Sequence, residues 1–99
     1  MGILDSLFGP KVDLSAIKKQ GAIILDVRST GEYQSGHGID SINIPLDQIH
    51  SKIDKLKGYN KPILTCCASG MRSGSAASIL KNHGIEAYNA GSWSSADRL

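Results

Sequence analysis

Short apolar segments alternate with helix-like segments along the chain, and this alternation restricts the fold more than any other feature. Residues 22–27 (AIILDV) are nearly continuous in apolar and β-branched side chains, as expected for a strand buried on both faces. Further strands are expected at 41–44, 62–66 and 86–89, and helices at 14–20, 30–34, 46–57 and 75–82. The order of these segments predicts a small α/β domain, with a parallel sheet and helices on both faces.

Length and charge exclude several classes of protein. The chain has 99 residues, which is enough for one domain, and we expect a short apolar segment at 1–9 followed by the domain at 10–99. The longest uninterrupted apolar run covers only residues 22–25, so no membrane span and no membrane partner are expected. A net charge of +2 is too small to predict a nucleic-acid partner.

The two cysteines, Cys66 and Cys67, are adjacent, which excludes a framework of disulfides between separated pairs. Free thiols fit a reducing compartment, and residues 1–10 lack the basic and apolar regions of a signal peptide. A cytoplasmic location is therefore expected. The three histidines and the cysteine pair do not have the spacing of metal ligands, so neither a metal nor a cofactor is predicted.

The most informative segment is CCASGMRS at 66–73, which links the strand expected at 62–66 to a helix. Ligands in open α/β sheets bind beyond the carboxyl ends of the strands. Small residues let the backbone curl so that its amides point inward and bind an anion, and the helix dipole adds to this effect. A cysteine beneath such a loop is expected to have a lowered pKa, and Arg72 supplies a cation with five donors.

The segment 67–73 resembles the active-site loop of the rhodanese-like sulfurtransferases, with cysteine first, glycine fourth, arginine sixth and serine next. The upstream signature of the family is matched in order by segments at 25–28 (LDVR), 32–37 and 42–46 (INIPL), and Gly91 and Trp93 fit its last element. The sequence departs from the family at 38–41 (GIDS), at Cys66 and at Met71.

The resemblance implies a single-domain thiosulfate sulfurtransferase in which Cys67 is the catalytic nucleophile. Cys67 would take a sulfane sulfur from a small anionic donor such as thiosulfate, hold it as a persulfide and pass it to cyanide or to a thiol, including a protein thiol. The donor-binding residues implied are Ala68, Ser69, Gly70, Met71, Arg72 and Ser73. Asp26, Arg28 and His37 are implied as structural supports of the site.

Two alternatives remain open. Five residues separate Cys66 from Arg72, and four separate Cys67 from it. The first alternative is a cysteine phosphatase or arsenate reductase that uses Cys66, because five is the spacing in the loops of those enzymes, some of which are similar to the rhodanese family in fold. Thr65 stands where those loops have histidine. Neighbouring side chains of a strand point to opposite faces, so only one cysteine can lie beneath the loop, and the position of Gly70 favours Cys67. The second alternative is a sulfur relay or binding module without turnover of small donors.

Overall fold

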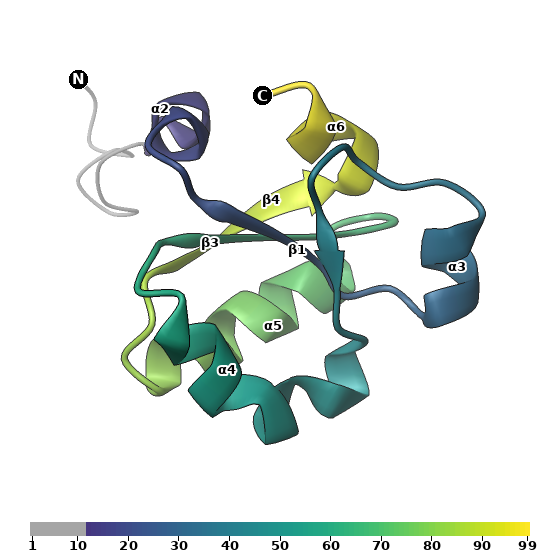
Figure 1. The fold of residues 1–99 in the computed structure, drawn as a ribbon. Helices are drawn as coiled ribbons and strands as arrows, with labels where there is room; N and C mark the ends of the chain where they lie inside the picture. Colours follow the sequence, from purple (N-terminus) through teal and green to yellow (C-terminus); the bar gives the residue numbers. More distant parts are fainter. Residues whose placement is uncertain (1–11) are drawn as a thin grey trace, which may run out of the picture.

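A computed structural model describes residues 12–99, so the segment expected at 1–9 lies outside the described residues. Figure 1 shows a central sheet with α4 and α5 on one side and α2 and α6 on the other. The elements are α2 (Leu14–Lys19), β1 (Ile23–Asp26), α3 (Thr30–Gln34), β2 (Ile42–Asn43), the 3-10 helix η1 (Leu46–Lys52), α4 (Ile53–Gly58), β3 (Ile63–Cys67), α5 (Met71–Asn82), β4 (Ala87–Ser92) and α6 (Trp93–Asp97).

The four strands are parallel and are ordered β2-β1-β3-β4. Every residue of β3 is buried, as a central strand covered on both faces requires. One core cluster joins the sheet to η1, α4 and α5, and a second joins it to α2 and α6. The predicted parallel α/β sheet with helices on both faces is therefore confirmed.

Helix ends follow the local signals in the sequence. The Asp13 carboxylate accepts a hydrogen bond from the Ala16 amide at the start of α2. Ser29 and Glu32 form a reciprocal capping box at the start of α3, which satisfies amides that have no partner within the helix. Gly84 follows the end of α5 with a φ of +79°, a conformation that glycine adopts without strain.

Three expectations for the helices need correction. The segment 46–57 is not one α-helix, because it begins as the 3-10 helix η1 and continues as α4. Leu46 and Ile49 are three residues apart, and the three-residue turn of a 3-10 helix places both on one face. The helix expected at 75–82 begins earlier, at Met71, and α6 was not predicted at all.

The last strand also differs from its expected range of 86–89, because β4 extends to Ser92. Thr65 pairs with Asn89 and Cys67 pairs with Ser92, so β4 has one extra residue over this stretch. Gly91 lies within the bulge with a φ of +83°. Bulges of this kind redirect side chains and are frequent beside functional sites. Among residues 12–99, no helix is long and apolar enough to cross a membrane.

Candidate active site

Cys67 is the last residue of β3, and its side chain is fully buried beneath the turn that leads into α5. The Gly70 amide donates a hydrogen bond to Cys67 Sγ at 3.0 Å, and Ser73 Oγ lies 3.4 Å from the same sulfur. The turn is possible because Gly70 has a φ of +99°, which L side chains rarely adopt. The predicted inward amide is therefore present at this position.

The surroundings of Cys67 favour its thiolate form. Burial raises the pKa of this thiol, but hydrogen bonds from the Ser73 hydroxyl and from loop amides outweigh burial and lower the pKa to about 7. The amides involved belong to Ser69, Gly70 and Ser73. Because the thiolate is the nucleophilic form of cysteine, the site holds a reactive sulfur near neutral pH.

Cys66 has the opposite environment, although it is the adjacent residue. Its side chain packs in the core cluster beneath α2 and α6, whereas Cys67 belongs to the cluster on the other face of the sheet. Burial, followed by the charge of Asp26, raises the pKa of Cys66 to about 12. The predicted separation of the two cysteines onto opposite faces is confirmed, and Cys66 is held as an unreactive thiol.

Asn89 fixes the turn above Cys67. Its Nδ2 donates to the Gly70 carbonyl at 2.9 Å, and its Oδ1 accepts from the Ser73 hydroxyl at 2.6 Å. The Gly91 amide donates to the same oxygen at 3.0 Å. The loop and the first turn of α5 are thus tied to the bulge in β4. Sequence reasoning did not identify Asn89, because its partners are distant in the chain.

Arg72 lies in the first turn of α5, where the sequence predicted a cation for an anionic donor. Its Nη1 and Nη2 donate to the two carboxylate oxygens of Glu32 at 2.7 and 2.9 Å, and both side chains are 38% exposed. Arg72, followed by the amide and hydroxyl of Ser29, lowers the pKa of Glu32 to about 2. In the sequence, Glu32 was noted as part of the matched segment 32–37, and this ion pair was not predicted.

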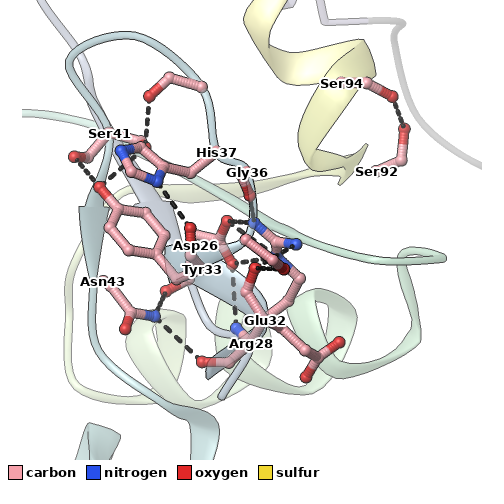
Figure 2. Close-up of polar contacts among 12 residues, drawn as sticks. Asp26, Arg28, Glu32, Tyr33, Gly36, His37, Ser41, Asn43, Ser92 and Ser94 are labelled. Carbon is pink, nitrogen blue, oxygen red and sulfur yellow. Dashed lines mark hydrogen bonds and ion pairs between the residues drawn. The ribbon is translucent and has the colours of Figure 1, made fainter. Parts of the chain in front are cut away.

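Asp26 and Arg28 form a buried ion pair at the end of β1, and Figure 2 shows their side chains facing each other. Arg28 Nη2 lies 2.8 Å from Asp26 Oδ2, and the Arg28 amide donates to Asp26 Oδ1 at 3.0 Å. Arg28 also donates to the carbonyls of Glu32 and Gly36, and its guanidinium lies over the Trp93 ring. Arg28 therefore connects the sheet to α3, to the following loop and to α6.

The other residues named from the sequence lie around this network or on the loop surface. His37 is exposed; its ring stacks on Tyr33 at 3.8 Å and Nδ1 lies 2.7 Å from the Tyr33 carbonyl oxygen (Figure 2). Ala68, Ser69 and Met71 are exposed on the turn. Within residues 12–99, no three His, Cys, Asp or Glu side chains are grouped so that they could hold a metal ion.

The class of protein is a small α/β domain in which a four-stranded parallel sheet places a cysteine with a lowered pKa beneath a strand-to-helix turn. The rhodanese-like domain family matches residues 11–95, and the chain belongs to this family, as the sequence motifs predicted. A solved structure described as rhodanese with anions from E. coli has a TM-score of 0.68 and 31% identity, covering 76% of this chain and 91% of that chain.

Two of the following related proteins carry names from sulfur chemistry, and the third, YqhL, has no activity in its name. Thiosulfate sulfurtransferase GlpE of Pseudomonas savastanoi is 35% identical over 77% of this chain and 71% of that protein. The tRNA sulfurtransferase of Thermoplasma acidophilum is 39% identical over 68% of this chain and 13% of that protein. YqhL of Bacillus subtilis is 36% identical over 69% of this chain and 54% of that protein, so this chain spans about half its length. The family and these names together point to sulfur transfer in general.

Proposed function

We propose that the protein is a sulfurtransferase that carries a sulfane sulfur on Cys67 as a persulfide. The observation that supports this most directly is the 3.0 Å hydrogen bond from the Gly70 amide to Cys67 Sγ, in a site where the cysteine pKa is about 7. The bond supplies a donor that stabilises the Cys67 thiolate, which is the form that attacks a sulfur donor. The relatives named as sulfurtransferases agree with this chemistry.

The reaction proceeds in two balanced steps. The Cys67 thiolate attacks the outer sulfur of thiosulfate, the S–S bond of the donor breaks, and sulfite leaves with the bonding electron pair. Cyanide or a thiolate then attacks the outer sulfur of the persulfide, so that thiocyanate or a new persulfide forms and the Cys67 thiolate is restored. This is covalent catalysis through an activated nucleophile, and no external oxidant or reductant is consumed.

Access of a donor to Cys67 requires local movement, because the side chain is fully buried. Ala68 and Ser69 are exposed directly after it, whereas the hydrogen bonds of Asn89 to Gly70 and Ser73 hold the rest of the turn. These two exposed residues, both predicted to bind the donor, are therefore the part of the turn that an incoming anion meets first.

The alternative of phosphatase or arsenate reductase chemistry on Cys66 has no support in the geometry. Cys66 packs on the far face of the sheet with a pKa of about 12, so its sulfur does not face the loop. A relay from a protein persulfide uses the same Cys67 chemistry, and differs from the enzyme only in the donor.

Steady-state formation of thiocyanate from thiosulfate and cyanide tests the proposal. We expect turnover in the wild-type protein and in the Cys66→Ser variant, which is the matched control, and none in Cys67→Ser. Activity that survives in Cys67→Ser, or that disappears only in Cys66→Ser, would contradict the assignment. Absence of turnover in the wild type, together with loading from a protein persulfide, would instead identify a relay.

A further inference from the structure

The Glu32 carboxylate is already paired with the guanidinium of Arg72, the group predicted to bind an anionic donor. Glu32 Oε1 accepts from Arg72 Nη1 at 2.7 Å, and Oε2 accepts from Nη2 at 2.9 Å. The amide and hydroxyl of Ser29 donate to Oε1 at 3.1 and 3.0 Å. Glu32 is thus held by its own helix start, and it does not depend on Arg72 alone for its position.

The other arginine near this edge of the sheet is also neutralised. Arg28 is paired with the buried Asp26, so each guanidinium has a carboxylate partner. The attraction of the loop for anions then comes mainly from the amides above Cys67 and the N-terminal end of α5. A dianion that approaches Arg72 meets the negative charge of Glu32, and the repulsion is twice that felt by a monoanion at the same distance.

A mostly apolar hollow borders the same arginine. Its volume is about 350 Å³, and it is lined by Val27, Ser29, Pro45, Leu46, Asp47 and Arg72. Val27, Pro45 and Leu46 offer carbon surface, which suits the organic part of a donor. Asp47 adds a negative charge to the lining, in addition to the Glu32 carboxylate that pairs with Arg72. A compact inorganic dianion gains little from these groups.

Given the proposed persulfide chemistry, on which this step rests, we infer that Glu32 sets donor specificity, favouring monoanionic organic persulfides over dianionic thiosulfate. The organic part of the donor lies in the hollow beside Arg72. The Cys67 thiolate attacks the outer sulfur of R–S–S⁻, the donor S–S bond breaks, a new S–S bond forms at Cys67 Sγ, and R–S⁻ leaves with the electron pair. Charge and sulfur are balanced in this exchange.

The Glu32→Gln variant isolates the charge, because glutamine at this position preserves the capping box. The rate constant for loading sulfur onto Cys67 is measured by intact mass with two donors, thiosulfate and the persulfide of N-acetylcysteamine. We expect loading from thiosulfate to rise about fivefold, the order expected for one unit charge a few ångströms away in a water-exposed site. Loading from the organic persulfide should rise only about twofold, because a monoanion feels half the electrostatic energy and its rate therefore changes by the square root of the thiosulfate effect.

Two further variants keep the test decisive. Glu86→Gln makes the same charge change at the residue before β4. Because β3 and β4 are parallel, this residue lies at the opposite end of the strands from Cys67, and the change should alter neither rate. Glu32→Ala loses the cap as well as the charge, and should still raise loading from thiosulfate relative to the organic donor. The gain from Glu32→Gln should shrink as salt concentration rises, because salt screens exposed charges.

The results separate the inference from the function on which it rests. An unchanged ratio of the two rates in Glu32→Gln, or a fall in loading from thiosulfate, would overturn the inference and leave Glu32 as a positioning residue for Arg72. A wild-type protein that loads thiosulfate faster than the organic persulfide would also overturn it. Failure of both small donors and of a protein persulfide to load wild-type Cys67 would contradict the proposed sulfur transfer itself.

Discussion

Replacing Asp26 by alanine is expected to destabilise the domain by about 3 kcal/mol, because the change leaves a buried arginine without its carboxylate. Asp26 is fully buried and accepts hydrogen bonds from the amide, Nε and Nη2 of Arg28. Removing one partner of a buried ion pair typically costs about 3–5 kcal/mol. Arg28 keeps its hydrogen bonds to the carbonyls of Glu32 and Gly36, which places the expected loss at the lower end.

Urea unfolding followed by circular dichroism measures this loss. With a dependence of about 1 kcal/mol per molar urea for a small domain, the unfolding midpoint should fall by about 2–3 M. Asp26→Asn keeps the shape of the side chain and should lose less. Combining Asp26→Ala with Arg28→Met removes both charges and should give a protein at least as stable as Asp26→Ala alone. A loss below about 1 kcal/mol for Asp26→Ala would refute the reasoning that this pair holds the end of β1 to α3.

Three further predictions concern the turn above Cys67. The rate of sulfur loading should rise with pH and level off above the Cys67 pKa of about 7, because only the thiolate attacks the donor. A midpoint near 9.0, the ordinary pKa of a cysteine thiol, would contradict this. Ser73→Ala should move that midpoint upward by as much as about one pH unit; an unmoved midpoint would mean that the one hydroxyl proton of Ser73 stays on Asn89 Oδ1 and is not donated to the thiolate. Gly70→Ala should cost about 1–2 kcal/mol, since its φ is +99°, and should slow loading. Gly58→Ala, at the end of α4 with open space around the glycine, is the control; it should not lower stability and should leave loading unchanged.

The strands and the packing of helices on both faces of the sheet were predictable, because a strand buried on both faces has a continuous run of apolar residues. Residues 22–27 show it as a continuous apolar run, and the structure has β1 there. The start of α5 was missed because serine and glycine at 73–75 are weak helix formers. The small size of Gly74 suits this position, since a Cβ here would make a tight contact of 3.3 Å with the side-chain Nδ2 of Asn89. Tertiary packing therefore outweighs local propensity in this turn.

Some features of the candidate site were also predictable from neighbouring residues, and others depended on contacts between distant parts of the chain. Side-chain alternation in β3 predicted that only one of the two cysteines lies beneath the loop, and the match of Gly70 to the family loop selected Cys67; both are read from neighbouring residues. The pairing of Glu32 with Arg72 joins residues 40 positions apart, and no local pattern encodes it. Asn89 was missed because the bulge that brings it to Gly70 arises from pairing between β3 and β4.

The net charge beside Cys67 therefore depends on the fold, because it is set by the pairing of Arg72 with Glu32. The sequence motif predicts an arginine in the loop, but the contacts formed in the fold determine whether that arginine can bind an anionic donor. Here Arg72 is already engaged by a carboxylate that α3 holds in place. Relatives with the same loop and a different residue at this position of α3 would then differ in donor preference.

Intact mass measurement of the reduced protein after incubation with a sulfane-sulfur donor, followed by cyanide, tests the central claim most directly. The account predicts that the wild type and Cys66→Ser each gain the mass of one sulfur atom. Cyanide should remove that sulfur as thiocyanate, and Cys67→Ser should gain none. Sulfur that attaches to Cys67→Ser, or that is lost only in Cys66→Ser, would contradict the assignment of Cys67 as the residue that carries it.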